Sequence, residues 1–511
     1  MWRRATVASR AAAASLRQPV AAHARMFSGH SPASWDSWRE TIKSTGESEF
    51  LKNFNLPRDR ASLAHLMRTV ATTKERNGDF VPRVIIKSLC SAYKTQDFDS
   101  KKLFLLTLAR DLHLDIPSLQ GNLASCAQNL AVVQSAEGVD WQHDQVEKYL
   151  RSIRALRESL VPLHELLFRQ ILSQMDGGML FLVHLRADVR AVLNKMSPTD
   201  ERNDNVALRD LDHHLQTFLA GWFSVGFLHL ERVTYEHSPG ALLEKIIRYE
   251  AVHPVGTIIE LKRRLGHARR CFAFFHPSVP DEPLVFVHVA LVKELAASMT
   301  YIKEATEHLE DEHDARAAIF YSISSTQPGL QGVDLGNYLI KQVAKRLQHE
   351  MPNISIYSTL SPIPGFIKWL HQTGYTRLTI DEIKALSDMF EKPVPVNELL
   401  AKALAIPEWH TTDDIVDVVK PILMRLGAHY IYVEKKRGKA FCSVANFHVR
   451  NGAIFERLNW LGDVSAKGLK NSAGLMVNYK YELSHVEANN ENYLLHNTIP
   501  VGAQPRALLG I

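Results

Sequence analysis

A glycine-rich segment between an apolar run and an amphipathic stretch is the feature that most constrains the fold of this chain. The apolar run, residues 317–324, has the pattern of a strand, and residues 333–348 have the 3.6-residue period of a helix. The segment that joins them reads Gly329-Leu330-Gln331-Gly332-Val333-Asp334-Leu335-Gly336. A second strand is predicted over residues 354–360. Strand, turn, helix and strand in this order indicate an α/β or α+β domain.

The turn supports two interpretations. Backbone N–H groups are free at the start of a helix and the helix dipole favours negative charge there, so the turn is suited to a pyrophosphate. Glycine in a strand-to-helix turn also allows close packing. No Gly-Lys-Ser/Thr follows, so the segment is not a P-loop, and its glycine spacing is not that of a dinucleotide fingerprint. Asp334, in the first turn of the predicted helix, either stabilises the helix start or orients a catalytic group.

Ser361 follows the second predicted strand directly and opens the segment Ser361-Pro362-Ile363-Pro364-Gly365-Phe366. Pro362 biases the serine towards an extended conformation, which fixes its hydroxyl as a preorganised donor requires. There is no Gly-x-Ser-x-Gly elbow and no base beside Ser361 in sequence, so a covalent nucleophile is not indicated. An anion-binding turn and a polar side chain at the end of the next strand are together suited to an acyl-CoA. The alternative for Ser361 is a turn serine without a chemical role.

His448 is the second candidate for chemistry. It lies in Asn446-Phe447-His448-Val449-Arg450-Asn451-Gly452, at the end of a strand predicted over residues 444–449 and beside a turn signal. A histidine in such a place is either a hydrogen-bonded structural residue or an acid–base group. The pattern by itself favours the structural role.

Composition and periodicity divide the chain into three segments. Residues 1–33 are rich in Arg, Ala and Ser and lack Asp and Glu, which predicts a mitochondrial transit peptide; the alternative is a disordered basic tail. Residues 34–221 keep a helical period and predict a bundle of seven or eight helices. Its clearest apolar faces consist of Leu63, Leu66, Met67 and Val70, and of Leu105, Leu108 and Leu112. Residues 222–511 predict the mixed domain, with further strands over 227–235, 271–275, 284–291, 430–433 and 444–449 and a helix-rich stretch over 380–426.

Composition also excludes several classes of protein. The net charge of +5 equals the number of arginines that precede the first acidic residue, so the remainder is near neutral and a nucleic-acid binder is not indicated. The apolar run over residues 179–185 is far too short to span a bilayer, so no membrane insertion is predicted. The four cysteines are scattered, without metal-ligand spacing or a disulfide framework.

Two charged clusters have mainly structural interpretations. Lys262-Arg263-Arg264 and Arg269-Arg270 either contact CoA phosphates or form a solvated helix face with a following strand edge, and the pattern favours the latter. Residues 307–314 hold two histidines among five carboxylates, without spacing that demands a metal, and predict a solvated loop.

Seven runs of this sequence resemble the malonyl-CoA decarboxylase family. They span residues 222–228, 251–255, 319–324, 329–336, 361–366, 459–461 and 474–479. The resemblance covers essentially all of the C-terminal domain, and the helical region has the family's organisation. It implies a helical oligomerisation domain followed by a catalytic domain of the GNAT-type acetyltransferase fold. In that fold the turn after the central strand holds the CoA pyrophosphate, and two neighbouring strands splay apart around the pantetheine arm.

The resemblance also implies the site residues. Ser361 and His448 match the family's catalytic serine and histidine, and Tyr481 matches a tyrosine near the active site. Asp334 stands where relatives can carry glutamate and is one methylene shorter. The residues that match the malonyl-CoA loop are Gln331, Gly332, Val333, Asp334, Leu335, Gly336 and Asn337.

The implied activity is that of a carboxy-lyase, which converts malonyl-CoA to acetyl-CoA and CO₂ and so controls malonyl-CoA in fatty acid metabolism. His448 is expected to protonate the thioester enolate, with Ser361 as its hydrogen-bonding or proton-relay partner. No metal or organic cofactor is required, because the thioester is the electron sink. A homotetramer built as a dimer of dimers, in the mitochondrial matrix, is also implied. The alternatives on the same fold are a CoA-dependent acyltransferase and a non-catalytic acyl-CoA-binding protein.

Overall fold

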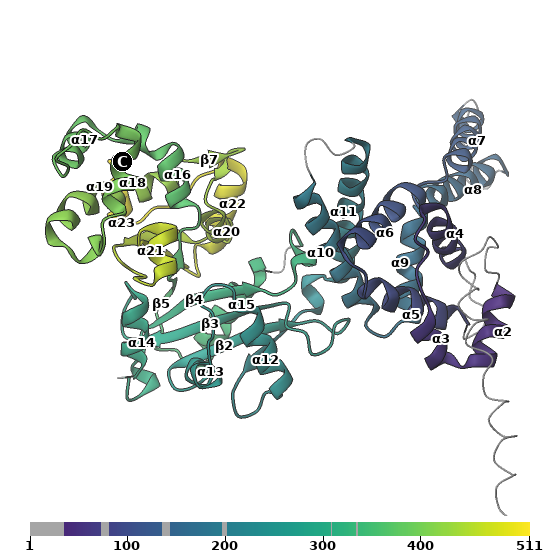
Figure 1. Cartoon of the computed structure of the whole chain (residues 1–511), viewed down its shortest axis with the longest axis horizontal. Coiled ribbons are helices and arrows are strands. Elements are labelled where there is room, and N and C mark those ends of the chain that lie inside the picture. Colours follow the sequence, from purple (N-terminus) through teal and green to yellow (C-terminus); the bar gives the residue numbers. More distant parts are fainter. Residues whose placement is uncertain (1–34, 73–80, 135–143, 197–201, 308, 334–335) are drawn as a thin grey trace, which may run out of the picture. The chain divides into compact units, whose positions relative to one another are not determined.

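The computed structural model describes residues 35–72, 81–134, 144–196, 202–307, 309–333 and 336–511. The predicted transit peptide therefore lies outside the described residues, as do Asp334 and Leu335. The described chain forms two compact units, each visible in Figure 1. The first extends to Trp222 and also includes Pro328–Gly332, and the second comprises Phe223–Gln327 and Val333–Ile511.

The first unit is built from helices. Its described residues contain ten of them, more than the seven or eight predicted, partly because Gly46, with a φ of 83°, separates two short helices at the start. They are α2 (Trp35–Thr45), α3 (Glu47–Asn53), α4 (Arg60–Ala71), α5 (Val81–Lys94), α6 (Phe98–Asp111), α7 (Ile116–Gln134), α8 (Asp144–Ser159), α9 (Leu163–Gln174), α10 (Gly178–Lys195) and α11 (Arg202–Trp222).

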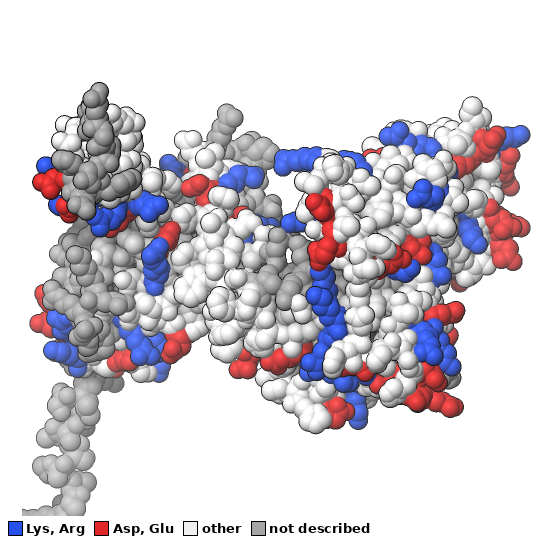
Figure 2. Space-filling view, turned by 180° about the vertical axis from the view of Figure 1, so that it is seen from behind, with Lys and Arg blue, Asp and Glu red and all other residues white. Residues whose placement is uncertain are grey.

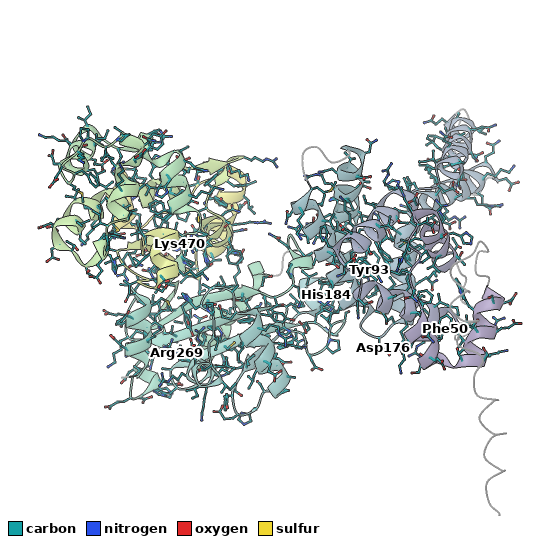
Figure 3. The ribbon with its side chains drawn as sticks, in the orientation of Figure 1. Phe50, Tyr93, Asp176, His184, Arg269 and Lys470 are labelled. Atoms are coloured by element: carbon teal, nitrogen blue, oxygen red, sulfur yellow. The ribbon has the colours of Figure 1, made fainter. Side chains whose placement is uncertain are left out.

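The predicted apolar faces form the core of this unit. All seven side chains named for α4 and for the stretch at the end of α6 are buried. Tyr93 on α5, labelled in Figure 3, packs between the rings of Phe104 and Phe181 and donates a 2.9 Å hydrogen bond to Asp188. Aspartates begin two of the helices, since Asp59 and Asp97 accept backbone N–H groups at the starts of α4 and α6.

The second unit is built around a mixed eight-stranded sheet. The strand order is β1-β2-β3-β4-β5-β10-β6, and β9 pairs with β10. The strands are β1 (His229–Val233), β2 (Arg269–Phe275), β3 (Val285–Val292), β4 (Ala317–Ser325), β5 (Ile356–Thr359), β6 (Ser361–Pro362), β9 (Ile454–Asn459) and β10 (Met476–Lys480), with a separate ribbon of β7 (Lys435–Lys436) and β8 (Lys439–Ala440). Helices followed by a mixed sheet confirm the predicted fold class.

The helices of the second unit lie between and after these strands, singly or in runs of two to four. They are α12 (Gly240–Tyr249), α13 (Ile258–Leu265), α14 (Met299–Glu307), α15 (Gly336–Glu350), α16 (Phe366–Gln372), α17 (Ile380–Ser387), α18 (Val396–Leu404), α19 (Asp413–Tyr432), α20 (Ser443–Arg450), α21 (Ala466–Ser472), α22 (Val486–His496) and α23 (Ala503–Leu509). The predicted helix over 333–348 corresponds to α15, and the helix-rich stretch to α17, α18 and α19.

Helices cover both faces of the sheet, as the alternation along β2 shows. Phe272 and Phe274 belong to the large core that includes α15, whereas Cys271, Ala273 and Phe275 pack with α12 and α13. Successive side chains of a strand point to opposite faces, so a strand covered on both sides is mostly apolar. Every residue of β2 and β3 is buried.

One parallel pair interrupts the antiparallel sheet. Strands β4 and β5 run parallel and pair from Ala317↔Ile356 to Phe320↔Thr359. Beyond that point β4 continues to Ser325 along β3, whereas β5 ends and the chain enters β6, which pairs with β10. The parallel pairing of β4 with β5 therefore ends at Phe320 and Thr359, and beyond it each strand pairs with a different neighbour.

Two predicted strands are wrong. Residues 430–432 are the end of α19 and Val433 is its C-cap, because the buried stripe of Leu423, Leu426 and Tyr430 carries the helical period to that point. Residues 444–449 lie in α20, where Ala445, His448 and Val449 are buried at helical spacing. In both segments the β-branched and apolar composition is typical of a strand. The buried side chains are nevertheless spaced as on one face of a helix, and the structure is helical there.

The distribution of surface charge and the apolar character of the helices are relevant to binding of nucleic acid and of membranes. Lysine and arginine alternate with aspartate and glutamate over the face shown in Figure 2. Within the described ranges, no helix is long and apolar enough to cross a bilayer.

Candidate active site

The end of β5 places Ser361 in the sheet. The chain passes from β5 through Leu360 into the two-residue strand β6, where Ser361 is paired with Val477 of β10. The serine is 6% exposed, and the turn after it closes at Gly365, whose φ is 79°. Backbone pairing together with the following proline fixes the direction of the hydroxyl.

His448 reaches this serine from α20. Its Nε2 atom lies 3.1 Å from Oγ of Ser361, and its ring stacks on Tyr479 with centroids 4.7 Å apart. The histidine is 3% exposed. Burial lowers the pKa of His448 to about 3, because a charged imidazolium is poorly solvated there. The resting imidazole is therefore neutral at physiological pH.

Tyr481 completes the contacts of the imidazole. It follows β10 directly, and its hydroxyl lies 2.8 Å from Nδ1 of His448. Burial raises the pKa of Tyr481 well above its ordinary value, so the phenol keeps its proton. Its described hydrogen bond is the one to His448, so the phenol O–H donates to Nδ1 and the ring proton is assigned to Nε2.

Thr359 fixes the serine from the other side. Its Oγ1 atom accepts the Ser361 O–H at 2.9 Å and the backbone N–H of Tyr479 at 3.1 Å. Asn478 donates to the Thr359 carbonyl at 2.8 Å and to that of Ala296 at 2.9 Å. With Ser361 donating to Thr359, its oxygen is free to accept the Nε2 proton, which agrees with the tautomer set by Tyr481.

Among the predicted residues, the structure brings Ser361, His448 and Tyr481 together in the second unit. The residues predicted to form the malonyl-CoA loop are assigned partly to each unit. Gln331 and Gly332 belong to the first, and Gly336 and Asn337 begin α15 after Val333 in the second. Asp334 and Leu335 lie outside the described residues, so neither interpretation of Asp334 is tested.

Thr359 is a site residue that the sequence analysis missed. The available signal was the two-residue period of a strand, which places residues 359 and 361 on one face. The prediction of a turn immediately after Leu360 concealed this relationship, since Ser361 in fact continues into a strand.

The predictions for the charged clusters need correction. Arg269, labelled in Figure 3, and Arg270 are buried on β2, which pairs with β1 and β3 and is therefore not a strand edge. Arg270 Nη2 lies 2.6 Å from Oε2 of Glu312, so the run over 307–314 is not wholly a solvated loop. Within the described ranges, no group of three or more His, Cys, Asp and Glu side chains has the arrangement of a metal site.

Comparison with known families matches most of this chain. The model of the malonyl-CoA decarboxylase C-terminal domain matches residues 226–509, and that of the malonyl-CoA decarboxylase N-terminal domain matches residues 130–223.

Individual relatives agree. The mitochondrial malonyl-CoA decarboxylase of Rattus norvegicus is 40% identical over 425 residues, which are 77% of this chain and 84% of the relative. The mitochondrial malonyl-CoA decarboxylase of Anser anser anser is 41% identical over 414 residues, which are 79% of this chain and 78% of the relative. The crystal structure of malonyl-CoA decarboxylase from Rhodopseudomonas palustris is 34% identical, with a TM-score of 0.72 over 88% of this chain and all of that one. The chain belongs to the malonyl-CoA decarboxylase family.

Proposed function

We propose that this chain decarboxylates malonyl-CoA, and that Ser361 and His448 carry the reaction. The observation that supports the proposal is the buried hydrogen-bonded series Tyr481–His448–Ser361–Thr359, within the domain that matches the family. The overall reaction consumes malonyl-CoA and one proton and yields acetyl-CoA and CO₂.

The thioester provides the electron sink. When the bond between the α-carbon and the carboxylate breaks, its electron pair forms an enolate and CO₂ leaves as a neutral molecule. The enzyme has to stabilise the negative charge on the enolate oxygen and supply a proton to carbon. Ser361 serves the first task, since its O–H can turn from Thr359 to the substrate oxygen. A positioned donor of this kind is worth roughly 10²–10³ in rate.

His448 serves the second task as a neutral acid. A thioester enolate carbon is far more basic than an imidazolate, so the Nε2 proton of a neutral ring suffices. The proton passes to the α-carbon directly or through Ser361. General acid catalysis by a positioned side chain is worth about 10²–10⁴ in rate. The O–H of Tyr481 remains bonded to Nδ1 and stabilises the negative charge that develops on the ring. Solvent then returns the proton to His448, which closes the cycle.

Family membership also supports proposals for the substrate loop, the location, the oligomeric state and the metabolic role of this chain. The loop Gln331–Asn337 binds the CoA portion of malonyl-CoA, and α15 begins within it. The relatives' mitochondrial names and the arginine-rich leader support a location in the mitochondrial matrix. A homotetramer and a role in fatty acid metabolism, through control of malonyl-CoA, complete the proposal.

A direct assay tests the activity. Protein lacking residues 1–33 is incubated with malonyl-CoA alone, and acetyl-CoA and CO₂ are followed. Turnover without an acceptor supports a decarboxylase. Binding of malonyl-CoA without acetyl-CoA formation contradicts it and points to an acyltransferase or an acyl-CoA-binding protein on this fold.

A further inference from the structure

Helices α10 and α11 of the first unit hold the turn Pro328–Gly332 by its backbone carbonyls. Arg186 lies on α10, the helix that also carries His184, which is labelled in Figure 3. Arg186 donates from Nη1 to the carbonyls of Gly329 at 2.7 Å and Gln331 at 2.9 Å. Gln216 on α11 donates to the carbonyl of Gly332 at 2.9 Å. Three of the turn's carbonyls are thus held by two side chains.

Fixing these carbonyls also orients the turn's N–H groups. A peptide bond is planar and trans, so a carbonyl and the N–H of the following residue point in opposite directions. With the carbonyls of Gly329 and Gln331 directed at Arg186, the N–H groups of Leu330 and Gly332 point away from it. The bond from Gln216 directs the N–H of Val333 away from α11 in the same manner. The N–H of Gln331 is bonded within the turn to the carbonyl of Pro328, so the two consecutive N–H groups directed away from the helices are those of Gly332 and Val333. Successive N–H groups of this kind can form an anion-binding concavity.

The turn lies too close to α10 for larger side chains. A Cβ at Gly329 would lie 1.8 Å from the carbonyl oxygen of Val183, and Gly332 has a φ of 87°. These two glycines therefore serve the contact with the helices as well as the turn itself.

Arg186 is built into this position. Its side chain is 1% exposed, and Nε donates to Asp212 on α11 at 2.9 Å, so the charge of the guanidinium is paired. A planar guanidinium can satisfy a carboxylate and two carbonyls at once, which an ammonium cannot do with the same geometry. Arg190, one helical turn later, donates to the side-chain oxygen of Gln331 at 2.6 Å.

We infer that Arg186 is a positioning residue for the phosphate end of the substrate, holding the turn so that its N–H groups face the CoA diphosphate. This inference rests on the proposed function, because it takes malonyl-CoA as the ligand of the turn. It assigns to the helical unit a part in substrate affinity in addition to its proposed part in assembly.

The test compares two substrates in Arg186→Met. Malonyl-pantetheine carries the same malonyl thioester as malonyl-CoA but lacks the diphosphate and the nucleotide. If the turn keeps its binding conformation only a tenth of the time, the KM for malonyl-CoA rises about tenfold. The kcat for malonyl-CoA and both constants for malonyl-pantetheine should remain near the wild-type values.

Two further variants guard against a folding defect. Gln216→Met removes one carbonyl contact from a partly exposed position and should raise the KM for malonyl-CoA by a smaller factor. Arg151→Met removes an exposed arginine whose described partner is Glu147 on the same helix, and should leave both substrates unaffected. Thermal melting of each variant shows whether the fold is retained.

The results distinguish a failure of the positioning role of Arg186 from a failure of the proposed decarboxylase activity. An equal loss with both substrates, or no change with either, in a folded Arg186→Met protein overturns the positioning role. A wild type without preference for malonyl-CoA over malonyl-pantetheine also overturns it, since the turn then binds no diphosphate. If the wild type forms no acetyl-CoA, calorimetry with CoA remains decisive: weaker binding to Arg186→Met supports the inference, and equal binding overturns it.

Discussion

The Nε2 atom of His448 lies 3.1 Å from Oγ of Ser361 across 87 residues of sequence. A helix supplies the first residue and a strand the second, and both side chains are buried. Because each residue has its other hydrogen bond to a fixed partner, Tyr481 or Thr359, the pair can hold one geometry through a reaction.

The pair should behave as a unit in mutagenesis. We expect Ser361→Ala to lower kcat by about 10²–10³ and His448→Asn by about 10²–10⁴. The double variant should be little slower than the slower single variant, because residues that share one proton path are strongly non-additive. Steady-state kinetics with malonyl-CoA measures this, and losses that simply multiply would show that the two residues act independently.

Tyr481→Phe tests the assignment of the ring proton. Removing the hydroxyl leaves Nδ1 without a donor and lets the imidazole adopt the other tautomer, which turns a lone pair towards Ser361. Loss of a partner that orients a histidine costs roughly 10–100-fold by analogy with metal-bound histidines, and we expect that loss in kcat with little change in KM. Nitrogen-15 NMR of labelled histidine should show Nε2–H in the wild type and a mixture in the variant. Nδ1–H in the wild type would contradict the assignment.

The pH dependence of kcat follows from the pKa of His448. Since burial lowers this pKa to about 3, the neutral ring is present throughout the physiological range and is protonated only in strong acid. We expect kcat to show no ionisation from His448 between about pH 5 and pH 9. A steep loss of kcat near pH 6 to 7 on the alkaline side, absent from His448→Asn, would instead mean that the imidazolium is the reacting form.

The sequence predicted the order of the central elements but not the environment of the site. The strand, turn and helix around Gly329 are local features, and local pattern was sufficient for β4, α15 and β5. Ser361 and His448 were selected through family resemblance, since a serine after a strand and a lone histidine have no distinctive spacing. Thr359 lies only two residues before Ser361, and the two-residue strand period was available to find it, but the turn predicted after Leu360 concealed it. The pairing of His448 with Ser361, 87 residues apart, depends on contacts between distant segments, which no local window contains. The same holds for Arg186, whose partners in the turn lie more than 140 residues away.

The Arg270–Glu312 pair should make the second unit sensitive to acid. Burial alone would raise the pKa of Glu312, but hydrogen bonds from Arg270 and from the backbone N–H of Ala268, with the charge of Arg270, lower it to about 2. A carboxylate whose pKa is lower in the folded state than in the unfolded state stabilises the fold above the unfolded value. Its contribution is therefore complete above the ordinary glutamate value of 4.5 and is lost as the pH falls towards 2.

Glu312→Gln isolates this contribution. At neutral pH we expect the variant to have a lower Tm than the wild type, because the buried guanidinium of Arg270 loses its charged partner. The difference in Tm should narrow as the pH falls below 4.5, since the wild type then loses the same charge. Glu147→Gln, which removes an exposed carboxylate paired with Arg151, is the matched control and should change Tm little at any pH. A Tm difference for Glu312→Gln that stays constant with pH would show that shape, rather than the ionised carboxylate, accounts for the stabilisation.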